Sequence, residues 1–530
     1  MRGLRKRMRI KPLNIQVDHH SEYEENSMLT SDLEQNELIF KKIFQNSSDI
    51  VFRKVQLAGE NHWLVIYLAT IVDEKMIDEH ILKPLISKRI KQEDLINDTA
   101  ETLDDLFISV GKTLISSKVT DIVSHVLNGH AVVFTIGDSN AMMVKVNNSK
   151  DHRTPGEPTS EPVIRGPMEG FIENISTNMG LIRRRLKTSR LKMESFKLGE
   201  LSQTEVVLTY IDGIVSDSVV EEVRKRVTRI QIDGILDSGY IEEFIEDAPF
   251  SPFPLVQSSE RPDVVAAELL DGKVAILVDT TPFVLIVPMT FWSGLQASED
   301  YYIHWTIGTF VRWIRFLFIF IAIFAPPLYV AVTTFHQEMI PTNLVLSIAS
   351  SREAVPFPAL IEALLMEIIF EALREAGIRL PKQIGQAISI VGALVIGQAA
   401  VQAGIISAPV VIIVSITGIA AFTIPRYSFA NGIRLLRFPI LFLAGTFGLY
   451  GIVLGFLGIL LHVTSLRSFG VPYFTPLAPI TITNLKDVII RAPIWAKTRR
   501  PQATGFNNPV REPAGQKPSP SQGKQSSENN

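Results

Sequence analysis

The chain has 530 residues, with 52 Lys or Arg, 55 Asp or Glu, a net charge of −3 and no cysteine. This balance shows no basic excess that would favour nucleic acid as a partner, and the lack of cysteine excludes disulfide bonds, thiolate catalysis and cysteine-ligated metal sites. Charge is unevenly spread, because positions 316–466 hold 13 charged residues in 151, whereas the other 379 positions hold 94. A single soluble globular protein and a pure membrane bundle are therefore both excluded.

The first part of the chain is predicted to be a flexible arm followed by a compact subdomain. Residues 1–37 are polar and basic and lack the apolar core of a secretory signal, so we expect the soluble part to stay in the cytoplasm. Residues 38–146 are predicted to form a first α/β subdomain, because β-rich runs alternate with helical apolar spacing. The expected strands are 50–57, 63–72, 131–136 and 142–146, and the expected helices are 75–90 and 100–115.

A second subdomain is predicted after a linker. Residues 147–164 are rich in Pro, Gly, Ser and Asn and are typical of a linker, and residues 165–312 are predicted to form the second α/β subdomain. Arg312 and Arg315 precede a long apolar window, which favours a cytoplasmic position for this subdomain. Its expected strands are 205–211, 274–278 and 283–287, and its expected helices are 172–186, 217–229 and 238–244.

Residues 313–466 are predicted to form a membrane domain of four to five helices. Windows 316–335, 383–425 and 438–466 contain no Asp, Glu, Lys or Arg. The middle window has 43 residues, enough for two spans, so the three windows predict four spans. A fifth candidate, 355–376, is apolar but carries several carboxylates, and it either spans the membrane within an oligomer or lies at the interface.

The remaining sequence completes the predicted architecture. Residues 467–498 are expected to be a juxtamembrane segment, with the side of the membrane left open by conflicting charge patterns. Residues 499–530 are rich in Pro, Gln, Ser and Asn and are expected to be a disordered tail. The fold class predicted from the whole sequence is an α/β cytoplasmic region of two subdomains followed by an all-α multi-pass membrane domain.

The sequence contains no motif that supports catalysis, a cofactor or a metal. Gly111-Lys112-Thr113 resembles the end of a phosphate-binding loop, but that loop needs a glycine five positions before Gly111, where this chain has Leu106. The ten histidines show no metal-ligand spacing, and no serine lies in a Gly-x-Ser-x-Gly turn. We therefore expect a protein that is not an enzyme and has no cofactor.

An acidic stripe is the first feature of the membrane half that could carry function. Glu367, Glu371 and Glu375 are spaced by four residues and project from one side of a helix. Repeated around the axis of an oligomer, the stripe would attract cations to a pore. The alternative is an interfacial helix whose acidic face lies in water.

Glutamines and glycines are the other candidate residues of this half. Gln398 and Gln402 are predicted either to hydrogen-bond a neighbouring helix or to line a water-filled path, because an amide in hydrocarbon requires a partner. Window 438–466 is expected to be one helix with five glycines on one face, which would allow another helix to approach closely. These glycines are Gly445, Gly448, Gly451, Gly455 and Gly458.

Four segments, in the same order, resemble the A subunits of spore germinant receptors, the GerABKA family. The resemblance extends over about residues 40 to 500 and leaves the termini uncovered. The segments are RGPMEGFIENISTNMGLIRRRLK (165–187), TPFVLIVPMTFWSGLQASEDYYIHW (281–305), VPFPALIEALLMEIIFEALREAGIRLPK (355–382) and QAISIVGALVIGQAAVQAGIISAPVVIIVSITGIAAFTIP (386–425).

The resemblance implies a multi-pass protein of the spore inner membrane whose two α/β subdomains face the spore core. It implies a permease-like B subunit and a lipoprotein C subunit as partners, contact with membrane lipid, and a complex triggered by small nutrients. Family A subunits are thought to form homo-oligomers with an ion-conducting path. The expected function is therefore the A subunit of a nutrient germinant receptor that triggers spore germination as a nutrient-gated cation channel.

Two other functions stay open at this point. One is a nutrient transporter subunit, although the sequence shows no internal repeat and few spans for a transporter. The other is a membrane-anchored sensor that binds a small nutrient in its soluble α/β domains, since two lobes can close on a ligand. The nutrient, the transported ion and the number of subunits are not specified by the sequence.

Overall fold

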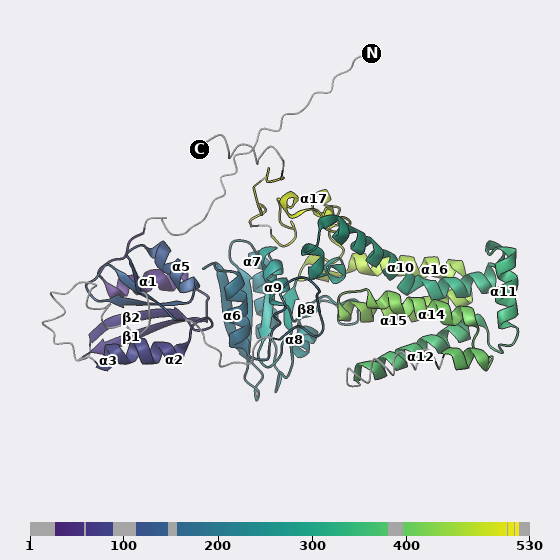
Figure 1. The fold of residues 1–530 in the computed structure, drawn as a ribbon, viewed down its shortest axis with the longest axis horizontal. Helices are drawn as coiled ribbons and strands as arrows, with labels where there is room; N and C mark the ends of the chain where they lie inside the picture. The colour runs from purple at the N-terminus through teal and green to yellow at the C-terminus, as the bar shows by residue number, and fades with distance from the viewer. Residues whose placement is uncertain are drawn as a thin grey trace, which may run out of the picture. The chain divides into compact units, whose positions relative to one another are not determined.

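The chain, seen in a computed structural model, separates into two compact units with their own hydrophobic cores (Figure 1). The first unit contains residues 1–151 and 187–189, and the second contains residues 152–186 and 190–530. The structure describes residues 27–57, 60–87, 113–146, 156–379, 395, 397–505, 507–513 and 515–518.

The first unit is built around a five-stranded antiparallel sheet in the order β1-β2-β4-β5-β3. Strand β2 is buried along residues 63–68, because helices cover both faces of the sheet (Figure 1). The strands are β1 (Ile50–Leu57), β2 (Glu60–Leu68), β3 (Thr113–Ser116), β4 (His130–Thr135) and β5 (Ala141–Lys145). The helices are α1 (Leu33–Ile43), α2 (Glu74–Ile77), a π-helical turn (Asp78–Leu82), α3 (Lys83–Ser87) and α5 (Val119–Leu127).

One helix predicted for this unit disagrees with the structure in the part of it that the structure describes. The end of the predicted helix 100–115 is strand β3, which pairs with β5 at the edge of the sheet. Thr113 and Ile115 of this strand are β-branched, and such residues favour a strand over a helix. The rest of that predicted helix, including Gly111 and Lys112, lies outside the described residues.

The second unit begins with a three-layer α/β/α arrangement. Alternate residues of β7 and β9 point to opposite faces, so Val206 and Leu208 contribute to one core, and Val207 and Leu277 contribute to the other. Helices α7 and α8 cover the first face, and α6 and α9 cover the second. The helices are α6 (Ile175–Arg185), α7 (Asp217–Thr228), α8 (Ser238–Ile245) and α9 (Pro262–Leu270). The strands are β6 (Leu191–Leu198), β7 (Thr204–Ile211), β8 (Gln257–Ser259), β9 (Val274–Val278) and β10 (Val284–Val287).

The two sheets share one topology. The second sheet has the order β6-β7-β9-β10-β8, which repeats the order of the first sheet with all neighbours antiparallel. Helices also stand at corresponding places, since α6 precedes β6 as α1 precedes β1, and α9 precedes β9 as α5 precedes β4. The structure thus shows a duplicated α/β unit, which the sequence did not indicate through any visible repeat.

The helical part of the second unit follows the α/β subdomain. Its first helix, α10 (Trp305–Phe335), has 31 residues and contains Pro326 and Pro327. Among the described residues, α10 alone is long and apolar enough to cross a membrane, while α14 and α16 are apolar but shorter. The other helices are α11 (Thr342–Arg352), α12 (Ala359–Arg379), α14 (Ala408–Phe422), α15 (Tyr427–Phe447) and α16 (Leu449–Ser465), with short turns at Ser293–Leu295, Ser298–Tyr301 and Gln337–Met339.

The single helix expected over window 438–466 is wrong, because the chain turns back at Gly448. This residue has a φ of +61°, a conformation that favours glycine, and it separates α15 from α16. A Cβ on Gly451 would lie 2.0 Å from the Leu443 carbonyl oxygen, and one on Gly455 would lie 3.2 Å from Ile440. The two helices therefore pack as an antiparallel hairpin, and the five glycines do not form one face.

The glycines of this window have separate surroundings in the hairpin. A Cβ on Gly445 would lie 2.6 Å from Leu360 of α12, so this glycine admits a side chain of another helix. A Cβ on Gly458 would have nothing within 4 Å among the described residues. Close helix contact is thus made at Gly445, Gly451 and Gly455 within one chain.

The C-terminal residues return to the second α/β subdomain, so the disorder expected for residues 499–530 is wrong for residues 499–505 and 507–511. Arg500 Nε donates to the Leu270 carbonyl at 2.9 Å, and Arg511 pairs with Asp271 at 2.5 Å. Before them, the short strands β11 (Arg467–Ser468) and β12 (Val471–Pro472), helix α17 (Ile482–Leu485) and a turn at Ile494–Ala496 also belong to this unit. The tail and the second subdomain therefore lie on the same side of the helices.

The hairpin predicts a specific sensitivity to a single methyl group. Gly451→Ala would force its Cβ against the Leu443 carbonyl, and we expect a loss of about 1–3 kcal/mol of stability from this overpacking. Gly458→Ala is the matched control, because its Cβ enters open space and alanine favours a helix by about 0.5–1 kcal/mol. Thermal melting of the purified protein in detergent checks both, and equal melting temperatures would contradict the hairpin contact.

Candidate functional site

Helix α12 carries the three carboxylates of the predicted acidic stripe. Its sequence is rich in Ala, Leu and Glu, residues with high helix propensity, and it contains no internal proline. Its contact face is buried against α10, α14 and α15 at Ala359, Ala363 and Met366. This packing fixes the position of Glu362 and Glu367, which are both fully buried on the same helix.

Glu367 forms a buried ion pair with Arg437 of α15. The same guanidinium donates from Nε to the Ala322 carbonyl of α10 at 2.7 Å. A regular helix would satisfy that carbonyl from residue 326, but Pro326 has no N–H. Arg437 therefore replaces the missing backbone donor and joins α10, α12 and α15 at one point.

This buried pair is not fully satisfied. Within the part of the chain that the structure describes, Glu367 Oε1 and Arg437 Nη2 have no hydrogen-bond partner. A buried ion pair is stable only when its remaining donors and acceptors are also hydrogen-bonded. A pair that leaves one donor and one acceptor without a partner therefore costs free energy to bury.

The other two carboxylates of the stripe are progressively more exposed. Glu371 is about one-third exposed and lies 3.8 Å from both Arg374 and Arg434. Glu375 is 59% exposed and pairs with Arg379 at 2.6 Å. Each stripe carboxylate thus has an arginine nearby. Arg434 and Arg437 of α15 are 63 and 70 residues along the sequence from their partners, which is beyond the reach of helical spacing rules.

Glu362 is a polar residue of α12 that the sequence did not assign to the site. It accepts hydrogen bonds from the Ser407 N–H at 3.0 Å and from its hydroxyl at 2.7 Å, and it pairs with Arg352 at 3.2 Å. Ser407 is the residue that precedes α14, so Glu362 satisfies a free N–H at the start of that helix. Its role is to hold α14 against α12.

The predicted polar lining lies apart from these contacts. Gln398 and Gln402 belong to a helical stretch, residues 397–402, and both side chains are exposed on the surface of this chain. The preceding part of the window, residues 383–394, lies outside the described residues. The structure therefore places the two glutamines where a partner chain or lipid can contact them.

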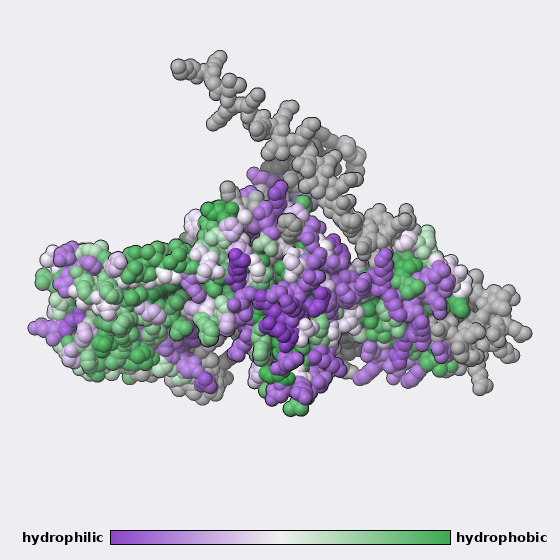
Figure 2. Space-filling model, turned by 180° about the vertical axis from the view of Figure 1, so that it is seen from behind, coloured by the Kyte–Doolittle hydropathy of each residue, from purple (hydrophilic) through white to green (hydrophobic). Residues whose placement is uncertain are grey.

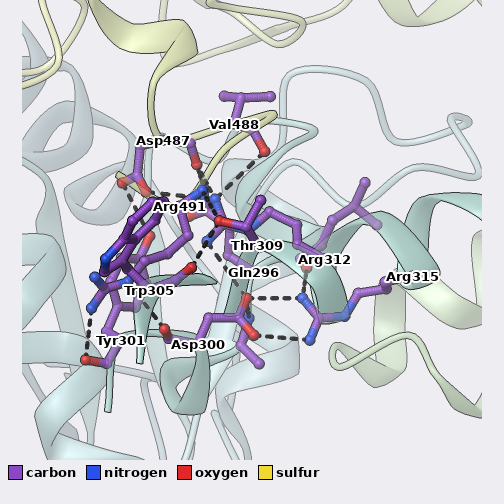
Figure 3. A network of polar contacts seen from close by, with 12 residues as sticks. Gln296, Asp300, Tyr301, Trp305, Thr309, Arg312, Arg315, Asp487, Val488 and Arg491 are labelled. Atoms are coloured by element: carbon purple, nitrogen blue, oxygen red, sulfur yellow. Dashed lines mark hydrogen bonds and ion pairs between the residues drawn. The ribbon is translucent and has the colours of Figure 1, made fainter. Parts of the chain in front are cut away.

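The start of α10 is held by a second polar network (Figure 3). Arg315 forms a bidentate pair with Asp300 at 3.0 and 3.1 Å, and Arg312 lies 3.5 Å from both Asp300 and Asp487. Arg491 of the C-terminal segment donates to the Asp300 carbonyl at 3.1 Å. Arg312 and Arg315, which the sequence suggested as cations beside a membrane boundary, are both buried in this network.

The C-terminal segment contributes the other half of that network. Asp487 accepts from the Tyr301 hydroxyl at 3.1 Å and pairs with Lys497, whose ammonium lies 4.2 Å from the centre of the Tyr301 ring. Burial lowers the pKa of Lys497, and the neighbouring Asp487 opposes that shift. The first helix and the chain's C-terminal segment are therefore locked to each other by charges that no local sequence pattern connects.

Comparison with known proteins places this architecture in a family. The family model described as Bacillus/Clostridium GerA spore germination protein matches residues 38–503, which include both α/β sheets, the helices and the Asp487 network. The chain belongs to the GerA family. The resemblance drawn from the four sequence segments is confirmed by this match.

Relatives of this GerA-family chain match it over most of its length. The uncharacterized membrane protein YfkQ of Bacillus subtilis (strain 168) is 47% identical over 89% of this chain and 91% of the relative. Spore germination protein KA of the same organism is 43% identical over 93% of this chain and 90% of the relative. The N-terminal domain of the A subunit of the Bacillus megaterium spore germinant receptor GerK3 is 35% identical and covers 51% of this chain and 99% of that domain, with a TM-score of 0.40.

The buried pair predicts strong coupling between two helices of this GerA-family protein. Arg437→Met leaves Glu367 buried without its partner, and we expect a loss of about 3–5 kcal/mol of stability. The double variant Arg437→Met/Glu367→Met removes both charges and should recover much of that loss, a coupling that a double-mutant cycle measures by thermal melting.

The exposed pair of Glu375 and Arg379 on α12 is the matched control for that cycle. It should change stability by less than about 1 kcal/mol, because water screens exposed ion pairs. Additive losses at Glu367 and Arg437 would show that the two side chains do not interact.

Proposed function

We propose that the chain is the A subunit of a nutrient germinant receptor of the spore inner membrane, acting with a permease-like B subunit and a lipoprotein C subunit to trigger germination. The observation that carries this proposal is the family match over residues 38–503, which spans the α/β region and the helices together. Several relatives are themselves named spore germination proteins, and they match this chain over most of their own length.

The surface of the helical part supports a multi-pass membrane domain. Large apolar side chains are exposed along α10, α14 and α16, and Figure 2 shows hydrophobic residues gathered over this part of the chain. Apolar surface of this extent is stable when lipid or another subunit covers it. The exposed apolar side chains that we assign to the lipid-facing surface include Phe320, Leu328, Ile412, Ile416, Ile419, Phe422, Leu457 and Leu461. The α/β subdomains then lie on the cytoplasmic side, facing the spore core.

A cation path formed by a homo-oligomer is the finer proposal for α12. Glu371 and Glu375 keep exposed carboxylates on this helix, and a ring of subunits would repeat them around an axis. Glu367 is held by Arg437 in the arrangement described, which we assign to the closed state. Nutrient binding to the receptor would bias the equilibrium toward an arrangement that releases this carboxylate. Gln398 and Gln402 would provide polar lining or contacts between subunits.

The cation path is tested through its exposed carboxylates. Glu371→Gln/Glu375→Gln should lower nutrient-triggered cation efflux from spores several-fold, because the local attraction for cations is removed. Glu338→Gln is the matched control, since Glu338 is an exposed carboxylate of the same helical part that lies outside α12. Unchanged efflux and cation selectivity in the double variant would rule out this role for the stripe.

A second candidate function, a sensor within the soluble region, is favoured by a cavity of about 250 Å³ in the second unit. It lies between α8 and the start of α15, and Asp237, Glu242, Tyr427 and Phe429 are among the residues that line it. The cavity is lined by residues of the α/β subdomain and by residues of a helix of the proposed membrane domain, so a ligand bound there would contact both. Saturable binding of a nutrient to the full-length protein, measured by calorimetry and lost on Glu242→Gln, would place sensing in this chain.

Glu242 predicts a dependence of stability on pH. Burial, together with repulsion from Glu246, Asp237 and Glu243, raises the pKa of Glu242 to about 7. Because the folded state holds this proton more tightly than the unfolded state, the stabilisation is complete below about pH 4.5 and is lost as the pH rises through about 7. Glu242→Gln should therefore stabilise the protein by about 1–3 kcal/mol at pH 8 and have little effect at pH 4.

Thermal melting of the full-length protein at the two pH values measures this difference. Glu200→Gln is the control and should show little pH-dependent change, because Glu200 is an exposed carboxylate of the same subdomain that is not among the groups that raise the pKa of Glu242. A Glu242→Gln variant with the same pH profile as the parent would contradict the raised pKa.

A further inference from the structure

Three arginines line one cavity at the junction of α12, α14 and α15. The cavity has a volume of about 220 Å³, and Arg374 of α12 and Arg434 and Arg437 of α15 contribute to its walls. All three side chains are largely buried, with 13%, 13% and 2% of their surface exposed. Burying three guanidinium groups costs free energy unless their N–H donors find hydrogen-bond acceptors.

Each of these arginines keeps a buried N–H group without an acceptor. Among the described residues, Arg374 Nη1, Arg434 Nε and Arg437 Nη2 have no hydrogen-bond partner. Glu371 lies 3.8 Å from the first two of these atoms, which is beyond hydrogen-bonding distance. Three donors from two helices are thus unsatisfied around a common space.

The charges around the cavity favour an anion. Three arginines face Glu371 and, through the buried pair, Glu367, so one positive charge is left over. Arg374 also donates weakly to Asn431 at 3.4 Å and lies 5.8 Å from the centre of the Tyr427 ring, and neither of these groups carries a negative charge. A cation would be repelled at this point.

The residues that line the cavity indicate which kind of ligand fits it. Phe370, Phe422 and Tyr427 make the remaining wall largely apolar around the guanidinium groups. An oxyanion with three or more acceptor oxygens can meet donors that arrive from different directions, and guanidinium groups bind phosphate especially well. An apolar wall beside such donors accommodates a hydrocarbon chain attached to the phosphate.

We propose that this cavity binds a phosphate-type oxyanion that bridges α12 and α15. The ligand would accept from Arg374, Arg434 and Arg437, and it would neutralise the positive charge next to the Glu371 carboxylate. The phosphate comes either from free inorganic phosphate or from the headgroup of an anionic phospholipid, since the same donors recognise both. The proposal does not rest on the cation path or on nutrient sensing, although Glu371 also belongs to the proposed cation path and Tyr427 lines both cavities.

The site is tested on the full-length protein in detergent and in lipid nanodiscs. Inorganic phosphate is titrated by calorimetry at constant ionic strength, and retention of phosphatidylglycerol from phosphatidylcholine nanodiscs is measured by native mass spectrometry. Arg374→Gln and Arg434→Gln should each weaken binding about tenfold or more, because each removes a charge-assisted donor. Arg379→Gln is the matched control on α12, with an exposed side chain that does not line the cavity, and it should leave binding unchanged.

Glu371→Gln gives a test of opposite sign that does not depend on removing an arginine. Loss of the competing carboxylate should tighten phosphate or phosphatidylglycerol binding several-fold. Binding of phosphate without lipid retention assigns the site to a free oxyanion, and lipid retention without phosphate binding assigns it to a headgroup. No saturable binding of either, or binding that the three cavity variants (Arg374→Gln, Arg434→Gln and Glu371→Gln) all leave unchanged, overturns the proposal.

Discussion

One guanidinium group determines how the helices of this protein pack. Arg437 donates to the carbonyl that Pro326 leaves without a backbone partner, and it pairs with the carboxylate of Glu367 on α12. Three helices therefore meet at a polar contact inside an otherwise apolar core. Because one partner cannot leave without stranding a buried charge, a movement that separates α12 from α15 must supply a new partner for Glu367 or Arg437.

The hairpin at Gly448 determines where the rest of the chain can go. A single helix over the last apolar window would carry the C-terminal segment away, whereas α16 folds back on α15 and returns it to the second α/β subdomain. There Asp487 and Arg491 can reach the start of α10, and Arg500 and Arg511 can reach the end of α9. The α/β subdomain, the first helix and the C-terminal segment are thus connected into one structure.

The charge around α12 in the structure is more positive than the sequence of α12 alone indicates. Read along the sequence, Glu367, Glu371 and Glu375 form an acidic stripe. In space, Arg434 and Arg437 from α15 stand beside two of these carboxylates and leave a positive surplus in the neighbouring cavity. A bound oxyanion would cancel this surplus and restore the attraction of the stripe for cations, so the two proposals are physically compatible.

The sequence by itself determined the order of the parts and the family. Strands β1, β9 and β10 follow short runs of apolar or β-branched residues, and helices α6, α7 and α8 follow apolar spacing of period 3.6. These elements lie within two or three residues of the predicted ranges. The charge-poor windows also located the helical part, because a segment with many apolar and few charged residues is favoured where it is removed from water.

Tertiary structure alone decided which charges meet. The partners Glu367 and Arg437 are 70 residues apart, Arg312 and Asp487 are 175 apart, and Asp271 and Arg511 are 240 apart. It also decided that Gly448 is a turn, because a left-handed glycine and a helical glycine look the same in a sequence of apolar residues. Local spacing describes the face of one helix, but ion pairs and turns of this kind depend on what the rest of the chain brings to that face.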